Sequence, residues 1–180
     1  MRLAWRAAVA LLVPAALSLS GCGKNGGAPV PPADYKAWTR MWPDQAVRQV
    51  KFDYPGNWQV EVDRRHGGSV TVKATDYEWW RLQYNPDQVR TPLEQFADQV
   101  RADRQRRRGD ILTSDRTAVT VADHEGIRVN YEVLADKVKG VRYVLDGGWV
   151  IEYEARDGQH KIVNSTFAHM SNSVDLTENR

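Results

Sequence analysis

Cysteine is almost absent from the sequence, since Cys22 is the only one among 180 residues. A disulfide requires two cysteines, so the chain cannot be cross-linked internally, and zinc sites built from several cysteines are excluded as well. At this length a single domain can bury an adequate hydrophobic core without either kind of support. The domain must therefore be held together by packing, and Cys22 needs another role.

An excess of charge of one sign is also lacking. The chain has 25 basic and 23 acidic side chains, and Arg2 and Arg6 lie in a segment that we expect to be removed, which leaves 23 of each. A domain without net charge lacks the basic surface through which nucleic-acid-binding proteins attract phosphates. We therefore expect no nucleic-acid partner.

Motifs of the common enzyme classes are missing too. The sequence has no HExxH, GxSxG or Walker pattern. Its four histidines, His66, His124, His160 and His169, lack the close spacing of metal ligands. Residues 123–125 place an acid beside a base, but neighbours on a turn or strand point in different directions. We expect no catalytic residue, metal or cofactor; the alternative is a small periplasmic hydrolase or ligand-binding enzyme built from scattered histidines and acids.

The N-terminal segment has the pattern of an export signal. Arg2 and Arg6 provide a positive start, and an apolar stretch follows over residues 7–19. This stretch is shorter than the roughly 20 residues that a membrane-spanning helix requires. Small residues come next, as before a cleavage site. We therefore assign residues 1–21 to a signal peptide.

Leu19-Ser20-Gly21-Cys22 resembles the lipobox of bacterial lipoproteins. The resemblance implies cleavage between Gly21 and Cys22, a diacylglycerol on the Cys22 sulfur, and an acyl chain such as palmitate on the new amine. Two or more acyl chains anchor a protein stably, whereas one does so only marginally. Gly and Lys follow the cysteine, where inner-membrane lipoproteins often have Asp, so we expect a periplasm-facing anchor in the outer rather than the inner membrane. The alternative is an ordinary secretory signal with a chance cysteine.

Two short segments separate this anchor from the domain. Residues 22–33 are rich in Gly and Pro and predict an extended tether. Residues 34–46 predict a short helical lead-in, because Trp38 and Trp42 are spaced i, i+4 and would share one face of a helix over 35–42. That face would dock on the domain or rest in the lipid interface.

Residues 47–176 predict an α+β domain, with 177–180 as a tail. Alternating apolar residues mark strands on both sides of a central helical pattern, and the short turns between them favour antiparallel pairing. Strands are expected near residues 50–54, 58–62, 70–74, 80–84, 118–121, 127–133, 141–145 and 149–155, and a closing helix carries Val163, Phe167, Met170 and Val174. The expected architecture is an α-β-α sandwich, with a mainly antiparallel sheet flanked by helices.

The central helix has start and stop signals of its own. Thr91, Pro92 and Glu94 form a capping-box pattern, and Gly109 suits the end. The arginine-rich run over 104–108 predicts a solvated helix end favoured by the helix dipole. The alternative for this run is a contact with anionic lipid or an acidic partner.

Trp79 and Trp80 are adjacent on a predicted strand and therefore point to opposite faces. If Trp80 joins the core with Leu82, then Trp79 and Tyr77 face the other way. They are buried if a helix covers that face and form an aromatic patch if it is open. Tyr77 and Trp79 are thus the candidate surface for a partner.

The domain resembles the PsbP-like proteins and their bacterial relatives of the DcrB kind. The resemblance rests on four segments in order: residues 52–58 (FDYPGNW), 91–96 (TPLEQF), 124–131 (HEGIRVNY) and 167–173. It implies an α-β-α sandwich and a non-enzymatic accessory role. We therefore expect a membrane-anchored, non-catalytic envelope lipoprotein that binds an unidentified envelope protein.

Overall fold

The computed structural model describes residues 35–40 and 47–178. The expected signal peptide, Gly21, Cys22, the tether and Trp42 lie outside these residues. No helix in the described part of the chain is long and apolar enough to cross a bilayer.

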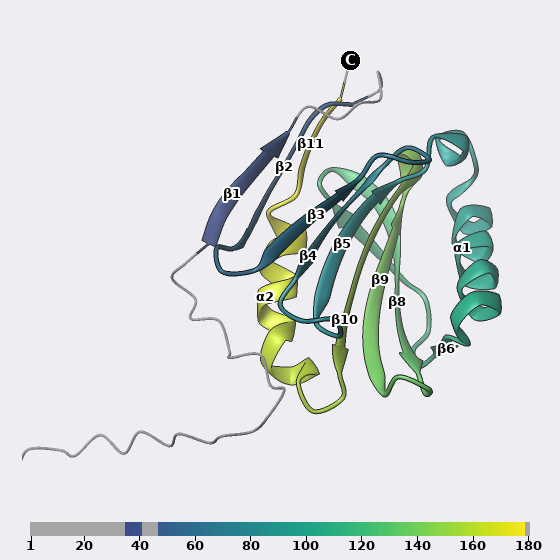
Figure 1. Cartoon of the computed structure of the whole chain (residues 1–180). Helices are drawn as coiled ribbons and strands as arrows, with labels where there is room; N and C mark the ends of the chain where they lie inside the picture. Colours follow the sequence, from purple (N-terminus) through teal and green to yellow (C-terminus); the bar gives the residue numbers. More distant parts are fainter. Residues whose placement is uncertain (1–34, 41–46, 179–180) are drawn as a thin grey trace, which may run out of the picture.

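The main sheet has eight strands, and each pairs antiparallel with its neighbours. In spatial order they are β3 (Gln59–Asp63), β4 (Ser69–Lys73), β5 (Trp79–Tyr84), β10 (Trp149–Arg156), β9 (Val138–Leu145), β8 (His124–Val133) and β6 (Ile111–Leu112), with β7 (Thr117–Val121) also on β8. Short 3₁₀ turns, η1 (Pro86–Gln88) and η2 (Asp146–Gly148), connect neighbouring elements. Helices α1 (Leu93–Arg108) and α2 (His160–Asn172) lie on opposite faces of the sheet (Figure 1). The α+β prediction is confirmed.

A second sheet of three strands lies on the α2 side (Figure 1) and was not expected. It contains β1 (Tyr35–Arg40), β2 (Val47–Pro55) and β11 (Asp175–Glu178). The predicted helical lead-in is therefore wrong for residues 35–40, which pair with β2 along their whole length. Trp38 lies against Phe52, with 4.9 Å between ring centroids. The expected tail at 177–180 is also wrong in part, since residues 177 and 178 belong to β11.

The larger hydrophobic core lies between the main sheet and α2. Trp80, Leu82 and Tyr153 point to this side and are fully or almost fully buried, as are Phe167 and Met170 of α2. Each such side chain contributes on the order of 2 kcal/mol through burial. The Trp80 indole also donates a hydrogen bond to the Ser171 hydroxyl at 3.1 Å. This core holds α2 and the small sheet against the main sheet.

A smaller core lies under α1. Phe96 and Ala97 of the helix pack on a strip of valine and isoleucine side chains: Ile127, Val129, Val144 and Val150. The capping box is wrong, because the helix begins after Pro92 with no side-chain cap, and Glu94 instead accepts a hydrogen bond from Arg116 at 2.8 Å. The predicted end is confirmed, since Gly109 adopts the left-handed conformation with φ 70°.

Candidate functional site

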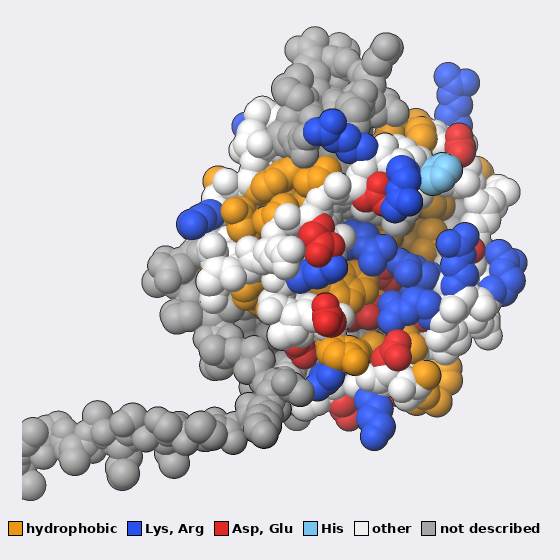
Figure 2. Space-filling model, in the orientation of Figure 1, with side chains coloured by type: hydrophobic (Ala, Val, Ile, Leu, Met, Phe, Trp, Pro, Cys, Tyr) orange, Lys and Arg blue, Asp and Glu red, His pale blue; other side chains and the backbone are white. Residues whose placement is uncertain are grey.

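The α1 face of the main sheet is only partly covered. Helix α1 packs on β8 and β9, and two of its arginines reach β10, but β3, β4 and β5 extend beyond it. The outward side chains of these three strands form the floor of an open hollow of about 670 Å³. We name it the α1-face groove; it is lined by Glu61, Val62, Asp63, Arg65, Ser69, Thr71, Lys73, Asp76, Trp79, Arg81 and Arg108. Figure 2 shows Lys and Arg side chains gathered on this face, with acidic ones between them.

Strand register explains which side chains meet on the floor. Glu61, Thr71, Arg81, Glu152 and Arg142 lie opposite one another across five consecutive strands. Paired residues of antiparallel strands project to the same face, so this row runs from the open groove to the region under α1. Charges that are far apart in the sequence thereby form one continuous layer.

Rim charges of the groove are paired locally. Lys73 lies 2.6 Å from Glu61 and Arg65 lies 2.7 Å from Asp63, and most of these side chains are well exposed. The Arg65 hydrogen bond lowers the pKa of Asp63 below its ordinary value. Exposed pairs of this kind add little stability but fix the positions of the charges.

Beneath α1 the same layer becomes a buried ionic network. Arg142, only 1% exposed, donates hydrogen bonds to Glu152 at 2.9 Å and to Asp110 at 2.7 Å. Arg104 of α1 binds the other oxygen of Glu152. Burial alone would raise the pKa of Glu152, but the surrounding arginines, Arg142 first, lower it to about 2.

A second buried carboxylate lies next to Glu152. Arg108 donates to Glu154 at 2.5 Å, and the Tyr131 hydroxyl lies 2.9 Å from Glu154 and 3.0 Å from Glu152. One hydroxyl proton can satisfy only one of these acceptors at a time. Burial and the neighbouring charge of Glu152 raise the pKa of Glu154. Burial also raises the pKa of Tyr131 well above its ordinary value, so this phenol stays protonated.

Arg81 differs from the other arginines of this layer. Within residues 35–40 and 47–178, its side chain makes no hydrogen bond or ion pair, and its buried Nε has no partner. Its guanidinium lies 4.7 Å from the centroid of the Trp79 ring. Burial lowers the pKa of Arg81, and the nearby charges of Glu152 and Glu154 offset this effect only in part.

A further hollow of about 420 Å³ lies between β5 and α1 and shares Arg81 with the groove. Its walls are mainly amides and arginines, including Gln83, Gln88, Gln99 and Arg104. The Gln88 side-chain oxygen is buried without a hydrogen bond. Arg81 thus faces accessible space on both sides.

The candidate partner residues lie at the groove but differ in exposure. Trp79 lines it and is 7% exposed, whereas Tyr77 is 39% exposed in the β4–β5 connection, next to the lining residue Asp76. Arg156 covers the Tyr77 ring at 3.8 Å. A partner role for Tyr77 and Trp79 stays a prediction.

The arginine-rich run divides into two sets. Arg106 and Arg107 are exposed and lie near Asp103, as expected for a solvated helix end. Arg104 and Arg108 instead point at the sheet and bind its buried carboxylates. The prediction of a solvated end is therefore wrong for these two residues, because glutamates on β10 supply partners that no local pattern indicates.

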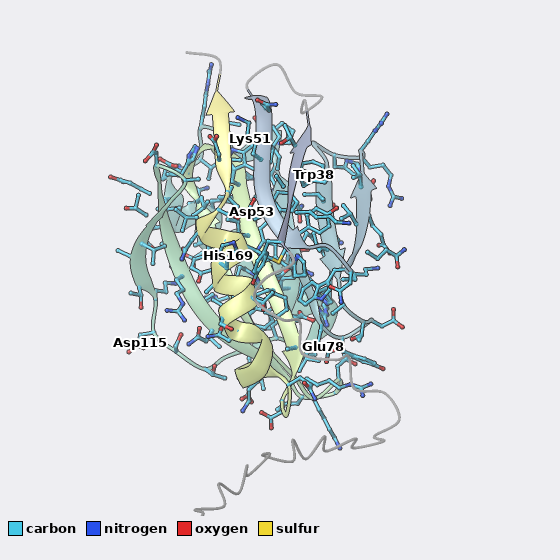
Figure 3. The ribbon with its side chains drawn as sticks, turned by 90° about the vertical axis from the view of Figure 1, so that its left-hand side faces the viewer. Trp38, Lys51, Asp53, Glu78, Asp115 and His169 are labelled. Atoms are coloured by element: carbon cyan, nitrogen blue, oxygen red, sulfur yellow. The ribbon has the colours of Figure 1, made fainter. Side chains whose placement is uncertain are left out.

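The three histidines whose side chains the structure describes do not come together. His124 lies 2.6 Å from Asp146, and His169 of α2 lies 3.5 Å from Asp53 of β2, where Figure 3 shows the two facing each other. His66 occupies the β3–β4 turn with φ 50°. The described residues contain no group of three histidines, cysteines or acids arranged to hold a metal ion.

Comparisons with known proteins support the fold. No protein-family model and no curated protein matches the chain. The solution structure of cyanobacterial PsbP (CyanoP) from Synechocystis sp. PCC 6803 is similar with a TM-score of 0.54 and 14% identity, over 86% of this chain and 98% of that one. LpqN, involved in cell envelope biogenesis of Mycobacterium tuberculosis, gives 0.48 and 8% identity over 79% and 91%. The likeness to CyanoP agrees with the expected PsbP-like fold.

Proposed function

We propose that this protein is a membrane-anchored envelope lipoprotein whose domain is a non-catalytic binding module for an envelope protein. The α1-face groove carries the proposal. It is an open polar surface with its charges held in place on strands, and the exposed Tyr77 lies beside it. Tyrosine and arginine are enriched in protein interfaces, where a polar rim surrounds anchoring side chains.

Catalysis by the buried acids is disfavoured by their position. Glu152 and Glu154 have pKa values moved in opposite directions, a feature that paired catalytic acids share. However, each is only 1% exposed, and arginines of α1 and β9 bind both oxygens of Glu152 and Oε1 of Glu154. A general acid or base must come within about 3 Å of its substrate. A hydrolase using this pair would have to displace α1, so a binding role is the simpler reading.

The lipid anchor is inferred from the sequence. A lipobox at 19–22 followed by a Gly/Pro-rich tether would hold the domain close to a membrane and facing the periplasm. Ten tether residues can reach on the order of 30 Å when extended. We place the anchor in the outer membrane, because no Asp follows Cys22.

Fractionation of cells that express the full chain tests the anchor. We expect the native protein in the outer-membrane fraction and a Cys22→Ser variant in the periplasm, because a serine oxygen does not take the lipid. A Cys22→Ser variant that stays in the membrane would rule out this anchor. Native protein in the inner-membrane fraction would contradict the outer-membrane location but not the lipid anchor.

Site-specific photo-cross-linking tests the binding surface. A photoreactive phenylalanine analogue at Tyr77 should give a discrete cross-linked protein in intact cells. Leu134 is a matched control, since it is also an exposed hydrophobic residue and does not line the groove. Equal cross-linking from both positions, or none from Tyr77, would contradict the proposal.

A further inference from the structure

Four arginines come together in the layer under α1 and the adjoining groove. Three of them bind carboxylates directly: Arg142 binds Asp110 and Glu152, Arg104 binds Glu152, and Arg108 binds Glu154 and Asp136. Charges removed from water normally have a direct partner, since an uncompensated one costs several kcal/mol. The fourth arginine, Arg81, has no such contact among the described residues.

Among the described residues, Arg81 is the arginine of this layer without a hydrogen bond or ion pair. Glu152 lies opposite Arg81 in the sheet, yet one of its oxygens accepts from Arg142 and the other from Arg104. Arg108 binds Oε1 of Glu154. Both glutamates attract Arg81 through space, but neither binds it directly.

The structure around Arg81 restricts the position of its side chain. Its guanidinium rests near the Trp79 ring, and its strand lies inside the sheet between β4 and β10. Thr71, directly opposite Arg81 in register, and Ser69 add hydroxyl donors to the groove. A fixed guanidinium beside hydroxyl groups is suited to an oxyanion, because little conformational freedom is lost on binding.

The charge of the groove selects among oxyanions. Glu61, Asp63 and Asp76 line its walls and would repel a doubly charged phosphate. Arg81, the one arginine of this layer without a direct contact to a carboxylate among the described residues, can neutralise a single negative charge. Its planar guanidinium can donate two parallel hydrogen bonds to a carboxylate. These features favour a carboxylate over a phosphate.

The geometry points to Arg81 as the receptor for a carboxylate group in the α1-face groove. This inference rests on the proposed binding function and names the chemistry that the groove recognises. The carboxylate comes from an acidic side chain of the protein partner, which reaches the open groove beside Tyr77. A free small carboxylate is the other source of the same chemistry.

Titration of the full mature chain in detergent micelles, followed by NMR of the arginine Nε–H signals, tests the inference. The probes are sodium acetate, sodium phosphate and sodium chloride. We expect a saturable shift of the Arg81 signal with acetate, a weaker response to phosphate and none with chloride. The signal is assigned by its loss in Arg81→Lys. A response to chloride equal to that of acetate, tighter binding of phosphate, or no saturable shift would overturn the inference.

Two arginine variants test whether acetate binding depends specifically on Arg81. Arg81→Lys should weaken acetate binding at least about tenfold, because the ammonium cannot form the bidentate contact. Arg106→Lys, at an exposed arginine of α1 that does not line the groove and lies near Asp103, should keep wild-type affinity. Equal loss in both variants would contradict a specific role for Arg81. The titration of wild-type protein stands even if Arg81→Lys folds poorly.

The source of the carboxylate is resolved by two blocked tripeptides, Gly-Asp-Gly and Gly-Asn-Gly. Tighter binding of the aspartyl peptide than of acetate, with none of the asparaginyl peptide, supports a protein source. Acetate binding without peptide binding overturns the protein source and leaves a free carboxylate. If acetate binds but the Tyr77 cross-link is absent, the partner proposal fails while the Arg81 site stands.

Discussion

Replacement of Arg142 by methionine should destabilise the domain strongly. The Arg142 side chain is 1% exposed and bridges Glu152 and Asp110. Methionine keeps most of the stem that packs in the interior but removes both ion pairs. Breaking a buried pair by deleting one partner costs about 3–5 kcal/mol, because a charge is left uncompensated. We expect a loss of this size in the free energy of unfolding at neutral pH.

The pH dependence of the stability loss shows whether the loss arises from charge. Because the pKa of Glu152 falls from 4.5 to about 2 on folding, its ionised form adds stability above pH 4.5 that is lost as pH falls towards 2. A shift of this size corresponds to about 3 kcal/mol at neutral pH. In the variant, Glu152 loses the cation that lowers its pKa most, so this pKa moves back up towards its ordinary value while Arg104 stays in place. Protonation then relieves the penalty, so the difference between the two proteins should shrink on acidification.

Urea denaturation followed by tryptophan fluorescence at pH 7 and pH 3 measures both effects. Arg65→Met is the matched control, since Arg65 is an exposed, ion-paired arginine of the same sheet face. It should leave stability nearly unchanged at both pH values. A loss below about 1 kcal/mol for Arg142→Met, or a loss that does not vary with pH, would refute the reasoning.

Two matched comparisons test other parts of the structure. Gly67→Ala should cost more than about 2 kcal/mol, because Gly67 has φ 87° and a Cβ there would lie 2.4 Å from the Pro86 ring. Gly109→Ala should cost only about 1 kcal/mol, since its φ of 70° is unfavourable but nothing lies within 4 Å; equal losses in urea denaturation would contradict this. Glu152→Gln should destabilise more than Glu154→Gln at pH 7, because the folded protein lowers the pKa of the first carboxyl and raises that of the second. A larger loss for Glu154→Gln than for Glu152→Gln in the same assay would contradict the directions of the two pKa shifts.

Local patterns predicted most of the main sheet and both of its helices. The alternation at Val70 and Val72 and at Trp80 and Leu82 identifies side chains that are fully buried on one face. This succeeds because side-chain direction in a strand depends only on position along the strand. The spacing of Phe96 and Ala97 likewise identifies the buried face of α1.

The small sheet could not be predicted in this way. Residues 35–40 are extended because they pair with β2, and residues 175–178 because they pair with the other edge of β2. The β11–β2 pairing brings together segments distant in the sequence, which no local pattern reveals. The β1–β2 pairing joins neighbouring segments, but the spacing of the tryptophans favoured a helix over a hairpin. Trp38 instead lies on a strand and packs on Phe52.

The groove and its ionic network were missed for a related reason. Alternation in β9 identified the face that carries Val141, and no sequence pattern singled out Arg142, Glu152 or Glu154. Helix α1 covers the other face and turns these charges inward. The available signal was the presence of opposite charges on two neighbouring strands, together with arginines on the helix that precedes them.

Mass spectrometry of the native protein, purified from membranes of a bacterium expressing the full chain, tests the lipoprotein assignment most directly. The expected result is a chain whose first residue is Cys22, with a diacylglycerol on its sulfur and an acyl chain on its amine. A chain that begins at another residue, or a Cys22 with a free thiol, would contradict it.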